Sequence, residues 1–179
     1  VNKYLRVVPA TIHIPIKDII KFLNAELIEK TIKTTHQELT NRFSISNPSI
    51  WISGLNPHAG ESGTIGEEEK KFIVPVIRKL QSEGYNLKGP MSADTMFYRK
   101  KRREFDAAIC MYHDQALIPI KTLDFHTSVN LTIGLSFIRT SPDHGTAFDI
   151  AGKNLANPTS TIEAIKLAWH LSKKEQKNQ

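Results

Sequence analysis

Three histidines follow three apolar segments that we expect to be β-strands. The segments span residues 5–10, 49–55 and 106–111, and the histidines are His13, His58 and His113. Ligands of open α/β sheets bind outside the carboxyl ends of the strands, so the three side chains could converge on one site. Neutral imidazole is a common ligand of zinc and similar divalent metals, and three protein ligands leave a position open for a substrate oxygen. A single histidine after a strand is more often a hydrogen-bonded loop residue, but the shared position of all three favours a site.

The second histidine belongs to the glycine-containing loop NPHAGESGTIG at residues 56–66, which leads into a predicted helix. Glycines permit close backbone approach, and a helix N-terminus attracts anions. A plain turn would explain the glycines equally well. The dinucleotide fingerprint GxGxxG does not occur.

Further along the chain, Lys121, Asn130 and Arg139 are almost evenly spaced. The two cations suit a phosphate or a carboxylate, which arginine can bind through two hydrogen bonds. Asn130 lies within an apolar segment, where a polar side chain needs a partner. Taken singly, each cation would more often be an ordinary surface residue.

Helical and strand-like periodicity alternate along the chain. Helices are predicted at residues 15–43, 66–84, 114–122 and 159–173, and further strands at 129–133 and 137–138. Pro75 is expected to kink the second helix. Strands that alternate with helices favour one continuous α/β unit whose sheet has crossover connections.

The composition excludes several classes of protein. The chain has 179 residues, one cysteine, 40% hydrophobic residues and a formal charge of +6. These values argue against disorder and against a disulfide scaffold, and no apolar run is long enough to span a membrane. Five consecutive cations at residues 99–103 indicate a solvated loop or a nucleic-acid contact, although no aromatic residue interleaves them. Because the chain opens on Val1 without a Met and a strand-like segment follows after only a few residues, we expect the chain to be part of a longer one.

Several segments together resemble one enzyme family. They are ATIHIP, GLNPHAGESG, GPMSADT, MYHDQALIPIK, VNLTIGLSFIRTSPDHGTAFDIAGK and LANPTSTIEAI. In this order they are similar to the 4-hydroxythreonine-4-phosphate dehydrogenases of pyridoxal 5′-phosphate (vitamin B6) biosynthesis. The resemblance implies a fold like that of isocitrate and isopropylmalate dehydrogenases, a three-layer sheet-and-helix sandwich. Residues 1–179 would be the C-terminal portion of a longer two-domain chain, without its N-terminal part, and would carry the metal-site and dimer-interface region.

The resemblance also implies an activity. The family oxidises 4-phosphooxy-L-threonine with NAD or NADP, and the product loses CO2 to give 3-amino-2-oxopropyl phosphate. A divalent metal (zinc, magnesium or cobalt) would be bound by His13, His58 and His113, with His113 reaching the partner subunit of a homodimer. The substrate would contact Lys121, Asn130 and Arg139, and the expected catalytic residues are Lys121 and Asp94. For Asp94, the alternative is a helix N-cap.

The loop after Arg139 resembles the adenosine-binding loop of isopropylmalate dehydrogenases. The expected cofactor-binding residues are His144, Gly145, Thr146, Ala147 and Asn157. Alternatively, this loop only closes the domain.

Other functions remain open at this point. A sibling dehydrogenase acting on a phosphorylated sugar acid such as threonate 4-phosphate would use the same contacts. A basic nucleic-acid-binding module and a non-catalytic dimerisation domain are further alternatives. We expect a cytoplasmic enzyme that binds neither nucleic acid nor membrane.

Overall fold

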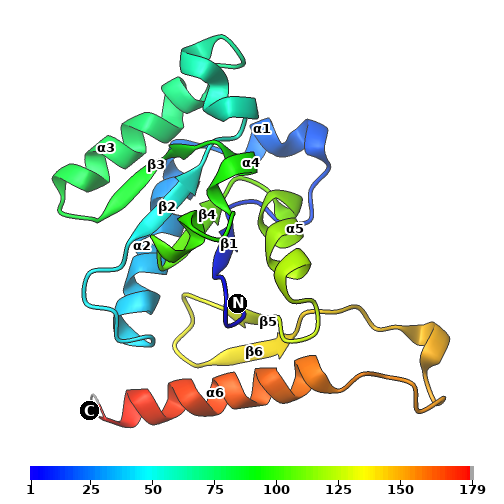
Figure 1. Cartoon of the computed structure of the whole chain (residues 1–179). Coiled ribbons are helices and arrows are strands. Elements are labelled where there is room, and N and C mark those ends of the chain that lie inside the picture. The colour runs from blue at the N-terminus through cyan, green and yellow to red at the C-terminus, as the bar shows by residue number, and fades with distance from the viewer. Residues whose placement is uncertain (178–179) are drawn as a thin grey trace.

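Four short parallel strands form the centre of the molecule, whose computed structural model describes residues 1–177 (Figure 1). Their order in the sheet is β1-β4-β2-β3. The bounds are β1 (Val7–Pro9), β2 (Ile50–Ser53), β3 (Leu87–Met91) and β4 (Ala107–Cys110). Because all pairs are parallel, the four carboxyl ends meet at one edge of the sheet.

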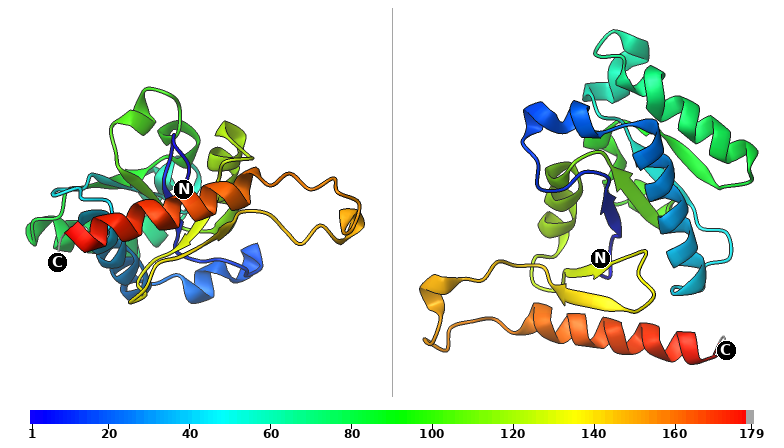
Figure 2. Two further views of the ribbon diagram at one scale, coloured as in Figure 1. Left: turned by 90° about the horizontal axis from the view of Figure 1, so that it is seen from below. Right: turned by 180° about the vertical axis from the view of Figure 1, so that it is seen from behind.

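Both faces of the sheet are covered by helices, because side chains alternate between faces along a strand. Ile50 and Ile52 pack into one apolar cluster with residues of α2 (Ala25–Asn41) and α3 (Val74–Ser82). Trp51, which lies between them, packs into a second cluster with residues of α4 (Ala93–Met96) and α5 (His113–Leu123). Figures 1 and 2 show the resulting layers of helices, sheet and helices. The predicted α/β class is therefore confirmed.

A separate antiparallel hairpin lies beside this unit. It consists of β5 (Val129–Thr132) and β6 (Arg139–Pro142), and α6 (Thr159–Lys177) runs along it (Figure 1). The hairpin loop is attached to α2, where the Gly134 N–H donates to Glu38 (3.3 Å) and the guanidinium of Arg42 donates to the carbonyl of Leu135 (2.7 Å). These contacts connect the hairpin to the main sheet unit.

The helix predicted at residues 15–43 is wrong in its continuity. The segment contains η1 (Ile16–Asp18), α1 (Ile19–Phe22) and then α2. Asn24 interrupts it, because its backbone is extended (φ −147°, ψ 173°) and its side-chain oxygen accepts a hydrogen bond from the Leu27 N–H (2.9 Å). Asparagine is a preferred N-cap, so a new helix begins where the apolar periodicity alone indicated continuation.

The predicted helix at residues 66–84 has two parts. A π-helical turn, η3 (Glu69–Ile73), leads directly into α3. Pro75 lies in the first turn of α3, so the irregularity precedes the proline. The stop at Gly84 is confirmed, since this residue adopts a left-handed conformation with φ +94°.

One strand was missed and another was misplaced. The missed strand β3 contains Gly89 and Pro90, and it lies at the edge of the sheet, where proline is tolerated. The strand predicted at residues 137–138 is wrong, because β6 begins at Arg139. The helix predicted at 114–122 is confirmed as α5, which accommodates Pro119, and the closing helix is confirmed as α6. Three short turns complete the structure: η2 (Pro57–Gly63), η4 (Lys101–Arg103) and η5 (Phe148–Ile150).

Candidate active site

His13 and His113 lie side by side at the carboxyl edge of the sheet. His13 follows β1 and His113 is the first residue of α5, directly after β4. Because β1 and β4 are neighbouring strands, the two imidazole rings come to 5.5 Å between centroids, with an interplanar angle of 46°. Two of the three predicted metal ligands are therefore brought together within one chain.

His58 and Asp94 form a second group along the same edge. His58 follows β2 and Asp94 follows β3, the next strand, and α4 contacts the turn η2 that carries His58. A hydrogen bond with Glu61 raises the pKa of His58 above its ordinary value, and the negative charge of Asp94 adds to that effect. Asp94 is not the N-cap of α4, since Ser92 holds that position and donates a hydrogen bond to the Asp94 carboxylate (2.5 Å).

The three histidines do not meet as one ligand group. Among the described residues, no cluster of three His, Cys, Asp or Glu side chains is arranged to hold a metal ion. The donor chemistry nevertheless fits a metal. Nδ1 of His58 lies 2.7 Å from a Glu61 oxygen, and Nδ1 of His113 lies 2.7 Å from an Asp114 oxygen. A carboxylate on one ring nitrogen, with the other nitrogen left for the ion, is the usual arrangement of metal-binding histidines.

The turn that carries His58 has an unusual backbone. Five consecutive residues from His58 to Ser62 have positive φ, between 40° and 77°. Only Gly60 adopts this conformation without steric penalty, and each other residue costs on the order of 1–2 kcal/mol. Such strain persists only where the surrounding structure holds it, and it tends to occur at functional sites.

Glu69, which we did not single out from the sequence, contacts the two residues that precede this turn. Its side chain is 3% exposed, and one carboxylate oxygen accepts hydrogen bonds from the backbone N–H groups of Leu55 and Asn56, both at 2.8 Å. The only sequence signal for Glu69 was its place in the run of three glutamates that follows the glycine loop.

A pocket of about 580 Å³ brings together four of the predicted site residues. It is lined by segments of α2, β1, α5, β5 and β6, and its polar residues include His13, His113, Asn130, Arg139 and Asp143. Asn130 pairs with Ser141, and Thr132 pairs with Arg139, so Asn130 and Arg139 share one face of the hairpin. Arg139 is fixed across the strands by a hydrogen bond that its guanidinium donates to the Thr132 hydroxyl (2.7 Å). The hairpin therefore presents two of the three predicted substrate-binding residues, Asn130 and Arg139, to the pocket.

Lys121 reaches the rim of this pocket through Asp143, a residue that sequence reasoning missed. The ammonium group donates to the Asp143 carbonyl (3.0 Å) and lies 3.6 Å from its carboxylate. Asp143 is itself held by the nearly buried Ser160, whose hydroxyl accepts from the Asp143 N–H (3.0 Å) and donates to the Ser128 carbonyl (2.8 Å). The start of α6 thus places the anionic partner of Lys121.

The predicted cofactor residues lie away from the pocket. His144, Gly145, Thr146 and Ala147 are exposed on the segment that projects from the molecule between β6 and α6 (Figure 1). Asn157 accepts from the Thr159 N–H (3.0 Å) at the start of α6, and its amide nitrogen lies 3.3 Å from the His126 ring. Their binding role stays a prediction.

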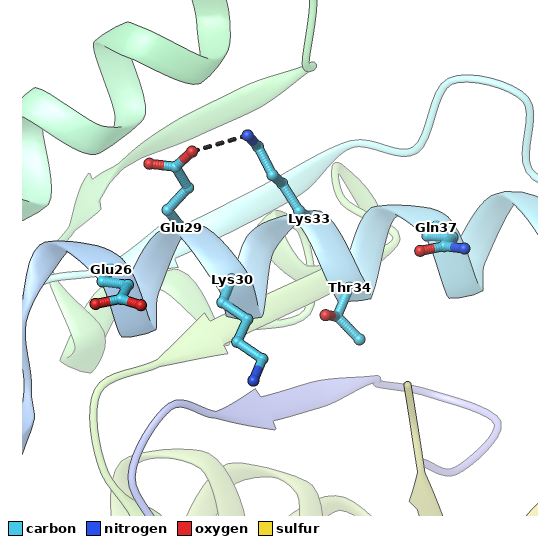
Figure 3. A pocket seen from close by; sticks show the side chains of 6 residues that line it. All are labelled: Glu26, Glu29, Lys30, Lys33, Thr34 and Gln37. Atoms are coloured by element: carbon cyan, nitrogen blue, oxygen red, sulfur yellow. Dashed lines mark hydrogen bonds and ion pairs between the residues drawn. The ribbon is translucent and has the colours of Figure 1, made fainter. Parts of the chain in front are cut away.

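A second, shallower pocket lies on the outer face of α2 (Figure 3). Its lining is polar, and Glu29 forms hydrogen bonds with Lys33 and Lys79 at 2.8 Å. Because it lies on a solvated helix face and Glu29 is already paired with Lys33, we do not assign this pocket to the site.

Residues 1–168 match the family model described as "Pyridoxal phosphate biosynthetic protein PdxA". The chain belongs to the PdxA family. It is 61% identical over 168 residues to the 4-hydroxythreonine-4-phosphate dehydrogenase of Roseobacter denitrificans, covering 94% of this chain and 52% of the relative. The corresponding enzyme of Ruegeria sp. is 57% identical, with coverage of 96% and 53%. The chain therefore spans about half the length of these PdxA-family relatives.

Solved structures agree with the family and with the fold. The 4-hydroxythreonine-4-phosphate dehydrogenase of Klebsiella pneumoniae superposes with a TM-score of 0.87 at 39% identity, over 96% of this chain and 52% of that one. A terephthalate 1,2-cis-dihydrodiol dehydrogenase of Burkholderia xenovorans superposes with a TM-score of 0.76 at 35% identity, over 94% and 53%. Within residues 1–177, no helix is both long enough and apolar enough to cross a membrane.

Proposed function

We propose that this PdxA-family chain contributes the metal site and part of the substrate pocket of an NAD(P)-dependent 4-hydroxythreonine-4-phosphate dehydrogenase. The observation that carries the proposal is the pocket that His13 and His113 line together with the hairpin residues Asn130 and Arg139. The names of the relatives support the same activity.

The substrate 4-phosphooxy-L-threonine carries a phosphate and a carboxylate, and the chain offers a cation for each. Arg139 is oriented by Thr132 and faces the pocket, so its guanidinium can bind an anionic group through two hydrogen bonds. Lys121 acts as a point charge at the rim, and Asn130 donates or accepts a hydrogen bond beside Arg139. Asp143 neutralises Lys121 before substrate arrives.

The proposed reaction oxidises the C3 hydroxyl to a ketone, with the hydride passed to NAD or NADP and the hydroxyl proton released. The resulting β-keto acid loses CO2 to give 3-amino-2-oxopropyl phosphate. A divalent cation would lower the pKa of the hydroxyl and polarise the ketone. His13, His58 and His113 would hold that cation, with His113 supplied to the partner subunit of a homodimer. Asp94 and Lys121 are the candidates for accepting and returning the proton.

The cofactor and the cellular location complete the proposal. The adenosine part of NAD or NADP would lie on the segment of His144 to Ala147, with Asn157 at its far side. Zinc, magnesium and cobalt are the divalent metals to test, because imidazole or carboxylate groups can bind each of them. A cytoplasmic location agrees with a biosynthetic role.

The decisive test compares the activity of two variants of a longer protein that contains this chain. Reduction of NAD and NADP is followed spectrophotometrically with 4-phosphooxy-L-threonine, for the wild type and for Arg139→Ala. We expect a large rise in KM for the variant, because the anion loses its bidentate partner, whereas His170→Ala on the exposed side of α6 should behave as wild type. Absence of any cofactor reduction by the wild type would reject the proposed substrate.

A sibling activity is the second candidate. The Burkholderia xenovorans structure shares the fold but is named for a dihydrodiol, so this scaffold serves more than one secondary alcohol. Threonate 4-phosphate retains the phosphate and the carboxylate and lacks the amino group. Comparison of kcat/KM for the two phosphorylated substrates separates the candidates, because the enzyme's own substrate should give the higher value.

A further inference from the structure

We propose that Glu69 is a positioning residue of the candidate active site. Its buried carboxylate holds the left-handed turn at residues 58–62 in one conformation and thereby sets where His58 presents its ring. The inference rests on the proposed function in one respect, namely that His58 binds a divalent cation.

The first observation is the set of donors around the carboxylate. Oε1 accepts from the N–H groups of Leu55 and Asn56, and Oε2 accepts from the side-chain amide of Asn56 (3.0 Å). Leu55 and Asn56 connect the end of β2 to the turn, so all three hydrogen bonds act at the point where the chain leaves the sheet. Hydrogen bonds to an ionised acceptor are roughly twice as strong as neutral ones, which suits Glu69 to this task.

The second observation is the close fit of the turn around the same carboxylate. A Cβ added at Gly60 would lie 2.5 Å from Glu69 Oε2, and one added at Gly54 would lie 3.1 Å from Oε1. Glycine at position 60 therefore leaves the room that the carboxylate occupies, whereas a Cβ at Gly54 would first meet Ala59 Cα, at 2.7 Å. The chain therefore packs against the Glu69 carboxylate at Gly54, before His58, and at Gly60, after it.

The third observation is how Glu69 itself is fixed. It is the first residue of the π-helical turn η3, which continues into α3, and Ile73 at the other end of that turn is fully buried. π-Helical turns are rare and often occur at functional sites, where they redirect a side chain. Here the turn belongs to a rigid helix packed on the sheet, so the carboxylate is a fixed support for a strained segment.

The alternative is that Glu69 only contributes to folding. It would then affect global stability without affecting the cation that His58 binds. The two roles differ in a measurable way, because a support for the turn acts locally on residues 54–62 and on cation affinity.

The test compares Glu69→Ala and Glu69→Gln with the matched control Glu67→Ala, whose side chain is exposed and forms an ion pair with Lys71 (2.8 Å). Amide hydrogen exchange of Leu55 and Asn56 is measured without metal, and Co²⁺ affinity is measured by titration of its visible absorption. For Glu69→Ala we expect exchange at these two amides to accelerate by at least about tenfold and Co²⁺ affinity to fall by roughly 10–100-fold, the usual effect of removing a support of a metal ligand. Glu69→Gln keeps one oxygen for both backbone donors and should recover most of each loss, and Glu67→Ala should match wild type.

Unchanged exchange and unchanged Co²⁺ affinity in Glu69→Ala would overturn the proposal, as would a loss of stability with wild-type affinity. If Glu69→Ala fails to fold, Gly60→Ala takes its place, because the added Cβ must displace the carboxylate or the turn. Wild-type exchange and affinity in Gly60→Ala would then overturn it. If the wild-type chain binds no Co²⁺, the proposed metal site fails, while exchange at Leu55 and Asn56 still decides whether Glu69 holds the turn.

Discussion

The centroids of the His13 and His113 imidazole rings are 5.5 Å apart, although the two residues lie far apart in the sequence. The contact arises because β1 and β4 are parallel neighbours and both histidines follow the strand ends. His58 follows β2, on the far side of β4 from β1, and is not part of this contact. In the proposed function both histidines are ligands of a divalent cation, and His113 would serve the site of the partner subunit.

We expect His13→Ala and His113→Ala each to weaken Zn²⁺ or Co²⁺ binding by more than roughly tenfold, since a lost ligand should cost at least as much as a lost support of a ligand. Isothermal titration with the purified protein measures the affinity. His170→Ala, an exposed histidine on α6, is the control and should leave it unchanged. Wild-type affinity in both histidine variants would show that the pair does not bind the cation.

The ion pair of His58 and Glu61 predicts a pH dependence. Glu61 raises the pKa of His58, so Glu61→Gln should lower that pKa towards the ordinary histidine value, which NMR titration of the imidazole signals measures directly. A raised pKa means that the pair stabilises the fold at pH below the ordinary histidine pKa. This contribution is lost as the pH rises through the raised pKa. An unchanged His58 titration in Glu61→Gln would contradict the contact.

The capping role of Asn24 predicts a stability effect. Asn24→Ala removes the acceptor for the Leu27 N–H and should lower the free energy of unfolding by about 0.5–2 kcal/mol. Asn24→Ser retains a capping oxygen and should lose much less. Urea denaturation followed by circular dichroism measures both values, and equal losses in the two variants would argue against a cap.

A substitution in the core of the central strand β4 should reduce stability more than the loss of the Asn24 cap. Ile109 is fully buried between β1 and β2, so Ile109→Ala should lower the free energy of unfolding by about 2–5 kcal/mol through lost burial and a residual cavity. Ile165→Ala is the matched control, because that side chain on α6 is 65% exposed and its removal should change stability by less than about 0.5 kcal/mol. Comparable losses at the two positions would show that the core does not lie at β4.

Much of the fold could be read locally. The buried strands β2 and β4 have short β-branched or small apolar runs, and α5 and α6 follow their periodicity, so these elements were predicted near their observed bounds. The edge strand β3 could not be recognised, because Gly89 and Pro90 hide its pattern and only pairing with β2 makes it a strand. The break at Asn24 was missed because one capping hydrogen bond outweighed a continuous apolar period.

The amino-acid sequence alone determined the chemistry that is available: imidazoles after three strands, and two cations and an amide around the hairpin. It did not determine which of these side chains meet. His13 contacts His113 because β4 lies between β1 and β2, and strand order depends on long-range packing that no local pattern encodes. The contacts of Glu69 with the Leu55 N–H and of the Asp143 carbonyl with the Lys121 ammonium likewise join residues that lie apart in the sequence. The sequence thus determines which functional groups are available. Which of these groups contact one another is determined by how the helices pack on the two faces of the sheet.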